Sequence, residues 1–190
     1  MSYQIGKTGV DARSTGANAL LKTVLLIAAG NLLLVASARV TVPFWPVPLT
    51  LETFAVLLIA ATYRWRLATA TMVLFLAEGA FGLPVFTGGG GPLYIMGPTG
   101  GYLLGYLLAT ILVGYLTDHG WKRNTLRLAG AMLLGEVLIL GIGYAWLGSL
   151  IGYDKAIVAG VTPFIFGDLV KIALAASTVS IGRDIVRRLS

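Results

Sequence analysis

Residues 126–147 read LRLAGAMLLGEVLILGIGYAWL, an apolar run that carries a single acidic residue, Glu136, near its middle. At about 1.5 Å per residue, a helix of this length spans the roughly 30 Å hydrocarbon core of a bilayer. A carboxyl group at that depth is costly unless it faces a partner or a watery cavity. The stretch therefore predicts a transmembrane helix that turns one polar group toward a neighbouring helix or a cavity.

Five further apolar stretches accompany this one. The expected helices are residues 19–38, 49–63, 67–82, 101–117, 126–147 and 163–183. Residues 1–18 form a polar N-terminal segment, and no small-residue cleavage pattern follows the first apolar run, so we expect a retained span. The 190 residues are 57% hydrophobic and 12% charged, against roughly 25% charged in soluble domains. The sequence predicts one integral membrane domain, an all-α bundle of six transmembrane helices.

The stretch between the first two helices is predicted to be extended chain at membrane depth. Residues 40–48 contain Pro43, Pro46 and Pro48, which lack backbone donors and favour extended geometry. The following helix, at about 22 Å, is too short to cross the core alone. Irregular backbone within a membrane must be covered by protein or line a cavity. We therefore expect residues 40–48 to dip into the bundle at its outer surface.

The basic residues indicate the orientation of the chain. Most of the 14 Lys and Arg residues fall on the same side of the predicted topology as the N-terminus, and cytoplasmic loops carry such an excess. We predict that both termini are cytoplasmic and that the chain is a multi-pass protein of the cytoplasmic membrane. The residues on that side are Lys7, Arg13, Lys22, Arg64, Arg66, Lys122, Arg123, Arg127, Arg183, Arg187 and Arg188.

Several function classes are disfavoured by composition. The net charge of +6 is spread over short loops between apolar runs, so we expect the lipid bilayer and not nucleic acid as the partner. The absence of cysteine excludes disulfides, thiolate chemistry and Cys-based metal sites. The single histidine, His119, lies in a polar stretch and is expected to be solvated. We predict no metal, no cofactor and no catalytic residue.

The long loop at residues 83–100 is rich in glycine and carries no charge. No lysine follows its glycines, which argues against a phosphate-binding loop. The loop is either a flexible linker or a lid, and its many apolar residues favour a lid that folds back over the helix ends.

Charged residues inside the predicted spans are the first candidates for a binding site. Asp168 and Lys171 are three residues apart and share one helical face, so they either neutralise each other or line a pocket together. The helix that carries them is expected to start with Thr162 as its N-cap and Pro163 at its first position. The full set of intramembrane charges is Glu52, Glu78, Glu136, Asp168 and Lys171, with Arg39 at the outer end of the first helix.

Uncharged residues add weaker signals. Tyr94, Tyr102, Tyr106 and Tyr144 are candidates for a pocket wall, although tyrosine is also common at membrane interfaces. Small residues within the spans indicate close packing of helices. They are Gly101, Gly105, Ala109, Gly141 and Gly143.

Three motifs together identify a family resemblance. They are VPFWPVPLTLETF at residues 42–54, GLPVF at 82–86 with GPTGGY at 97–102, and GDLVK at 167–171. In this order they resemble the BioY family, the biotin-specific substrate-binding (S) components of energy-coupling-factor (ECF) transporters. The resemblance implies a six-helix S-component bundle that takes up biotin and binds it near the outer face, beneath two loops.

The resemblance also implies roles for individual residues. Asp168 would accept the ureido N–H groups of biotin, and Lys171 would bind its carboxylate, or Arg39 if Lys171 pairs with Asp168. Further candidates for the site are Glu78, Tyr94, Tyr102 and Tyr144.

Partners and alternatives follow from the same resemblance. The chain has no Walker A sequence, so ATP hydrolysis would come from ATPase subunits acting through a transmembrane coupling subunit; the alternative is a homo-oligomer. Two other functions stay open. One is an S component for another vitamin, and the other is an intramembrane enzyme that uses Glu78 or Glu136 with Asp168. No His, Cys or Ser constellation supports the enzyme.

Overall fold

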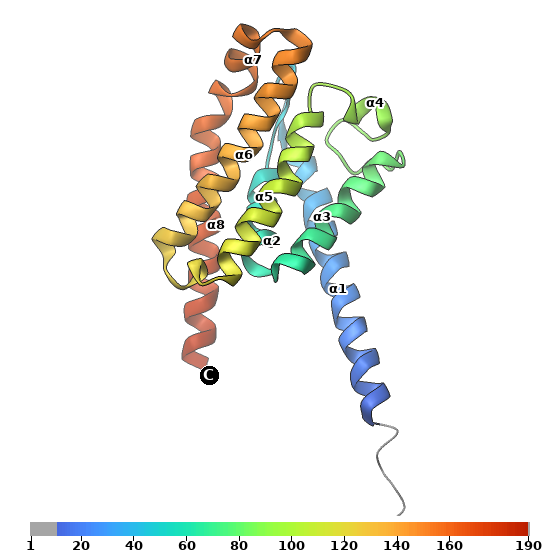
Figure 1. The fold of residues 1–190 in the computed structure, drawn as a ribbon, viewed down its shortest axis with the longest axis vertical. Helices are drawn as coiled ribbons and strands as arrows, with labels where there is room; N and C mark the ends of the chain where they lie inside the picture. Colours follow the sequence, from blue (N-terminus) through green and yellow to red (C-terminus); the bar gives the residue numbers. More distant parts are fainter. Residues whose placement is uncertain (1–10, 190) are drawn as a thin grey trace, which may run out of the picture.

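The computed structural model describes the backbone of residues 11–189 and the side chains of residues 16–189. It is a helical bundle with one short β-ribbon (Figure 1). The elements are α1 (Asp11–Arg39), β1 (Thr41–Val42), β2 (Leu49–Thr50), α2 (Glu52–Thr62), α3 (Trp65–Ala80), α4 (Pro92–Ile95), α5 (Gly100–Asp118), the 3₁₀ turn η1 (Trp121–Arg123), α6 (Thr125–Ile151), α7 (Tyr153–Gly160) and α8 (Thr162–Leu189).

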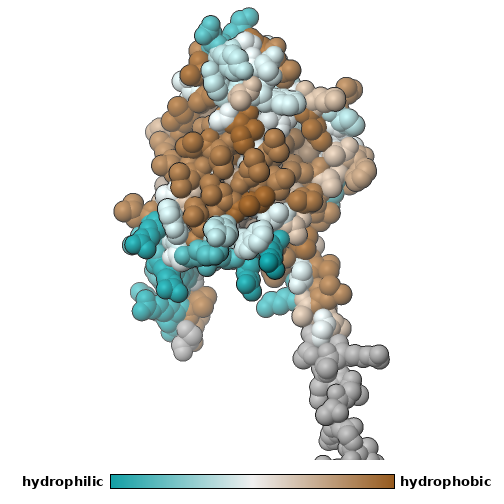
Figure 2. Space-filling view, viewed as in Figure 1, coloured by the Kyte–Doolittle hydropathy of each residue, from teal (hydrophilic) through white to brown (hydrophobic). Residues whose placement is uncertain are grey.

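The start of α1 and the end of α8 lie at the same end of the bundle (Figure 1). We call this the terminal end, and we call the opposite end, which carries α4 and α7, the loop end. Figure 2 shows a belt of hydrophobic side chains across the middle of the face in view, with hydrophilic residues gathered most densely at the terminal end. This distribution is the one that a bilayer imposes on a spanning bundle.

Four helical stretches of the described chain are long and apolar enough to cross a membrane. They are Gly16–Arg39, Gly100–Asp118, Thr125–Ile151 and Tyr153–Leu189. Helices α2 and α3 are shorter, with 11 and 16 residues. The prediction of a helical, multi-pass membrane protein is therefore confirmed, whereas the count of six spans stays a prediction.

The first and last helices of the chain are longer than their apolar stretches predicted. Helix α1 begins at Asp11 instead of residue 19, and α8 continues to Leu189 instead of ending at residue 183. Hydropathy marks where a helix crosses apolar surroundings, and helical hydrogen bonding can continue through polar residues beyond that point. Residues 1–10 of the predicted N-terminal segment lie outside the described residues.

The chain between α1 and α2, residues 40–51, is not helical, as predicted for residues 40–48. β1 and β2 pair antiparallel with Thr41 opposite Thr50, and a cis peptide bond joins Trp45 to Pro46. Val47 and Thr50 are buried, so the second half of this 40–51 segment packs into the bundle, whereas its first half, with Trp45 83% exposed, lies at the surface. Helix α2 begins at Glu52 and not at residue 49, because Leu49 and Thr50 are held in the ribbon.

The sequence-based assignment of Thr162 as an N-cap is wrong. Its hydroxyl donates to the carbonyl of Ile157, 3.0 Å away in α7. Helix α7, which hydropathy did not separate from its surroundings, ends at Gly160 directly before α8. Helix α8 therefore follows a one-residue break at Val161 and not an open loop. Thr162 is already the first residue of the helix and does not cap its first backbone N–H groups.

Helices α5 and α6 meet at glycines. A Cβ atom on Gly101 would overlap Trp146, one on Gly143 would overlap Tyr102, and one on Gly105 would lie 2.8 Å from Ile139 Cα. Close approach of two membrane helices requires such small residues. Gly141 was expected to take part, but a Cβ there would meet open space.

We predict that Gly105→Ala destabilises the bundle, because its new methyl group meets backbone that cannot yield. Overpacking of this kind costs about 1–3 kcal/mol. The matched control is Gly141→Ala on α6, which should be neutral or slightly stabilising because alanine is the better helix former. Thermal unfolding in detergent micelles measures both variants. Equal melting temperatures would contradict the close approach of α5 to α6 at Gly105.

Candidate functional site

One enclosed cavity lies between α2, α5, α6 and α8, toward the loop end. Its polar lining consists of four charged residues, Glu52, Glu136, Asp168 and Lys171, and of the hydroxyl groups of Thr50, Thr53, Thr87, Thr99, Tyr94, Tyr102 and Tyr106. Its apolar lining consists of Val47, Pro48, Leu103, Ile139, Leu140 and Phe164. In the described chain, neither α1 nor α3 contributes to this lining.

The cavity is tightly closed. Its volume is about 30 Å³, whereas pockets for small organic ligands measure about 300–1,000 Å³. The walls must therefore move apart before a ligand of vitamin size enters. The two walls formed by connecting segments, the 40–51 segment and the loop at residues 81–99 with its short helix α4, are the parts best able to do so.

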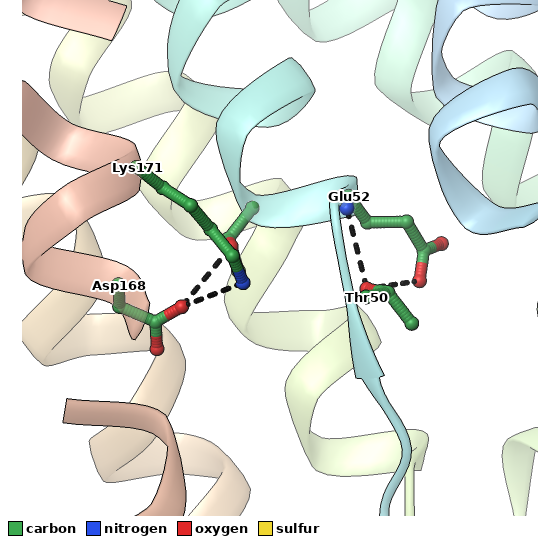
Figure 3. A network of polar contacts seen from close by, with 5 residues as sticks. Thr50, Glu52, Asp168 and Lys171 are labelled. Carbon is green, nitrogen blue, oxygen red and sulfur yellow. Dashed lines mark hydrogen bonds and ion pairs between the residues drawn. The ribbon is translucent and has the colours of Figure 1, made fainter. Parts of the chain in front are cut away.

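An ion pair within α8 lies in the cavity wall, and hydrogen bonds to Thr53 connect it to α2 (Figure 3). Lys171 Nζ lies 2.9 Å from Asp168 Oδ1 and 3.0 Å from Thr53 Oγ1. The Thr53 hydroxyl in turn donates to Asp168 Oδ1 over 3.3 Å. Asp168 is only 1% exposed. A carboxylate buried this deeply requires a compensating cation, and the i, i+3 spacing on α8 supplies one.

Glu52 forms a second polar cluster at the start of α2 (Figure 3). The Thr50 hydroxyl donates to Glu52 Oε2 over 3.0 Å and accepts from the backbone N–H of Glu52. The Thr87 hydroxyl lies 3.4 Å from the same carboxylate oxygen and 3.0 Å from the carbonyl of Ala38. Glu52 thereby joins the 40–51 segment, the 81–99 loop and the end of α1.

Several acceptor atoms in the cavity have no hydrogen-bond partner among the described residues. They are Glu52 Oε1, Asp168 Oδ2 and both carboxyl oxygens of Glu136. Glu136 interacts electrostatically with Asp168 and with Lys171. Buried polar atoms in native proteins are normally satisfied, so unpaired acceptors around a cavity indicate a site for a molecule that offers N–H or O–H donors.

The 81–99 loop closes the cavity at the loop end, through Thr87, Tyr94 and Thr99. Phe86 anchors the loop, because its ring stacks on Tyr94 and meets the edge of Phe75, each with a centroid distance of 5.2 Å. The prediction that this loop folds back onto the bundle is confirmed.

Two polar groups also belong to the closure of the cavity by the 81–99 loop, the indole of Trp146 and the phenol of Tyr94. The indole N–H of Trp146 donates to the carbonyl of Gly97 over 2.9 Å and ties the far end of the loop to α6. Burial raises the pKa of the Tyr94 phenol above its usual value, so the group stays protonated and keeps its donor.

The structure brings together four of the seven residues that the family resemblance nominated for the site. It also brings in Glu52, Glu136 and Tyr106, which the sequence named as intramembrane charges or pocket-wall candidates. Asp168, Lys171, Tyr94 and Tyr102 all line the cavity, and the Tyr102 hydroxyl donates to the carbonyl of Gly160 over 2.7 Å.

The other three, Arg39, Glu78 and Tyr144, lie outside the lining. Arg39 donates to the carbonyl of Pro84 in the 81–99 loop. Glu78 accepts from the amide of Asn31 on α1 over 2.7 Å. The ring of Tyr144 meets the edge of Tyr153 at a centroid distance of 5.6 Å.

Other cavity residues carried no clear signal in the sequence. Threonine is common in membrane helices and in loops alike, and nothing in the sequence marks the threonines that face a cavity. Thr50, Thr53, Thr87 and Thr99 are of this kind. The one available hint in the sequence was that a threonine and a glutamate, Thr50 and Glu52, closely follow the prolines. Within residues 16–189, no group of three His, Cys, Asp or Glu side chains is arranged to hold a metal ion.

Comparison with known proteins gives consistent matches. The BioY family profile matches residues 10–188. A probable biotin transporter BioY from Pyrococcus horikoshii is 37% identical over 155 residues, covering 81% of this chain and 91% of the relative. Biotin transporter BioY2 from Lactococcus lactis subsp. cremoris is 34% identical over 176 residues, covering 91% and 94%.

A solved structure also superposes on this chain. It is the S-component for biotin from an ECF-type ABC transporter, crystallised at 2.1 Å, with a TM-score of 0.79 and 26% sequence identity. The alignment covers 88% of this chain and 93% of that one.

We predict that Lys171→Met destabilises the fold by about 3–5 kcal/mol, because it leaves the Asp168 carboxylate buried without its cation. The double variant Asp168→Leu/Lys171→Met should recover most of that loss, since it removes both charges. Thermal or denaturant unfolding in micelles measures the three proteins. A single variant as stable as the parent would show that the pair contributes nothing to the fold.

Proposed function

The chain belongs to the BioY family, and we propose that it captures biotin as the S component of an ECF-type transporter. The observation that carries this proposal is the enclosed cavity around Asp168 and Lys171, in a bundle that superposes on a biotin S component. The family is one of carriers and not of enzymes, so the ligand leaves chemically unchanged.

The polar end of the cavity suits the ureido ring of biotin. That ring offers two N–H donors and one carbonyl acceptor. The carboxyl groups of Asp168 and Glu136 lie close enough to share a proton, and their remaining oxygen lone pairs are acceptors for the N–H groups. Lys171 uses its ammonium for two contacts, to Asp168 and Thr53, and an ammonium has three N–H donors. The third can donate to the ureido carbonyl.

The apolar wall suits the sulfur-containing ring of biotin. Leu103, Ile139 and Phe164 face the cavity, and the ring of Phe164 stacks against Tyr102 at a centroid distance of 6.1 Å. These groups gain from contact with a thioether ring through burial of apolar surface. A ligand with one polar and one apolar side would therefore be oriented by the cavity.

The carboxylate of biotin needs a cation of its own, because Lys171 already pairs with Asp168. Arg39 is the candidate. It lies next to Ala38, whose carbonyl contacts the cavity residue Thr87, and it is held by the carbonyl of Pro84 in the 81–99 loop. We place the carboxylate at this rim, where movement of the loop frees the guanidinium for a charge-assisted bond.

The orientation follows from charge. We propose six crossings, made by α1, α2 with the 40–51 segment, α3, α5, α6 and α8. An even number of crossings agrees with both ends of the helical chain lying at the same end of the bundle (Figure 1). The basic residues at the terminal end put that end in the cytoplasm. The cavity then lies toward the outer face of the cytoplasmic membrane, where uptake begins.

Energy for transport must come from partners. The sequence has no Walker A motif to bind ATP. The superposable S component is a part of an ECF-type ABC transporter. We therefore propose that a transmembrane coupling subunit and ATPase subunits complete the transporter; a homo-oligomer is the alternative.

We predict that the purified chain binds labelled biotin and that Asp168→Asn weakens binding at least about tenfold, which is 1.4 kcal/mol. The reason is the loss of a charged acceptor for the ureido N–H groups. The matched control is Glu78→Gln, a membrane carboxyl that lies outside the cavity and should leave affinity unchanged. A competition panel of vitamins measures specificity.

Two results would count against this. A folded chain that binds no biotin, or prefers another vitamin, would refute the proposed ligand. Unchanged affinity in Asp168→Asn would give Asp168 a structural role only.

We predict that bound biotin holds the 81–99 loop closed. Because the chain has no cysteine, a single Thr99→Cys at the cavity wall can be labelled in intact cells with a membrane-impermeant maleimide. Saturating biotin should slow this labelling at least about tenfold by covering the site. The control is Phe81→Cys in the same loop, where the parent residue is 89% exposed and labelling should not respond to biotin. Equal rates at residue 99 with and without biotin would exclude the lid.

A further inference from the structure

A second concavity lies between α1 and α3, at the terminal end. This α1–α3 groove has a volume of about 600 Å³ and is open along one side of the molecule. Its lining consists of Thr23, Ile27, Arg64, Trp65, Arg66, Leu67 and Ala70. It shares no residue with the cavity described above, so it is a separate feature of the fold.

Two arginines stand at the mouth of the groove. Arg64 immediately precedes α3, and Arg66 lies in its first turn with its guanidinium 5.4 Å from the ring centroid of Trp65. Both are exposed, and neither pairs with a carboxylate in the part of the chain that the structure describes. The acidic group beside them, Asp118, accepts from the backbone N–H of Trp65 over 3.1 Å. The mouth therefore carries net positive charge.

The floor of the groove is apolar. Ile27 comes from α1, and Leu67 and Ala70 come from α3. Ala70 lies about 6 Å along the helix axis from Arg66, toward the hydrophobic belt. The groove is therefore basic at the membrane surface and apolar below it, which is the polarity of one phospholipid.

Helix α1 leans away from the bundle along this groove (Figure 1). It contacts the other helices at Leu26, whose carbonyl accepts from the Tyr63 hydroxyl over 2.8 Å, and at Gly30, where a Cβ would lie 2.9 Å from Thr71. Nearer its start, Leu21 and Val24 are more than half exposed. The groove therefore lies between α1 and α3 and stays open on one side.

We propose that the α1–α3 groove binds one anionic phospholipid, with its phosphate on Arg64 and Arg66 and one acyl chain along Ile27, Leu67 and Ala70. Charge complementarity selects this occupant. Guanidinium groups suit phosphate oxygens because of their forked geometry, and basic pockets between membrane helices bind anionic headgroups. The volume admits the headgroup and the upper part of a chain. Bound there, the lipid braces the free half of α1 against α3.

The test uses the full chain purified in detergent micelles, with added phosphatidylglycerol or with phosphatidylcholine of the same acyl chains. Phosphatidylglycerol should raise the melting temperature by about 2–4 °C over phosphatidylcholine. Native mass spectrometry should show one retained anionic lipid. Biotin binding in each sample reports correct folding independently of the lipid.

Two variants localise the effect. Arg64→Gln/Arg66→Gln should abolish the specific shift, and so should Ala70→Trp, which fills the floor but keeps both arginines. The matched control is Arg187→Gln/Arg188→Gln, which removes the same charge from the exposed end of α8. This control should keep the shift.

Three outcomes would overturn the proposal. The first is a parent protein that does not distinguish the two lipids. The second is equal loss of the shift in both arginine pairs, which would indicate general surface charge. The third is an equal shift from soluble glycerol phosphate, which would show that no acyl chain is bound.

Discussion

The contact on which the rest of the site depends is the ion pair between Asp168 and Lys171 inside an apolar bundle. Desolvating either charge alone would cost several kcal/mol, so each is tolerable only beside the other. Thr53 extends the pair to α2, since its hydroxyl accepts from Lys171 and donates to Asp168. The start of α2 is thereby fixed against α8, and the 40–51 segment that leads into α2 is fixed with it.

The fold could be predicted where apolar length alone decides it. Helix α5 was expected at residues 101–117 and occupies Gly100–Asp118, because both its helix and its apolar run end at the membrane surface. The same reasoning fails for α1 and α8, whose helices continue into polar sequence. It also fails for α4 and α7, since helices of 4 and 8 residues are too short to show a hydrophobic period.

The site could be predicted only where one helix suffices to define it. Asp168 and Lys171 are neighbours through helical spacing, whatever surrounds them. Glu78 lies at a suitable depth, but its partner is Asn31 on α1, and depth does not tell which neighbour a side chain faces. The threonines of the cavity come from three different parts of the chain, so only the tertiary fold gathers them.

The same packing divides the bundle into two sides, one that encloses the cavity and one that does not. Helices α2, α5, α6 and α8 enclose the cavity with the two loops, whereas α1 and α3 line none of it within the described chain. Helix α1 touches the site only through its last residues, where Ala38 and Arg39 hold the 81–99 loop. Its other end stands free beside the α1–α3 groove. The side of the bundle that holds the cavity is therefore the one that binds the ligand, whereas the α1–α3 side is available to a membrane lipid.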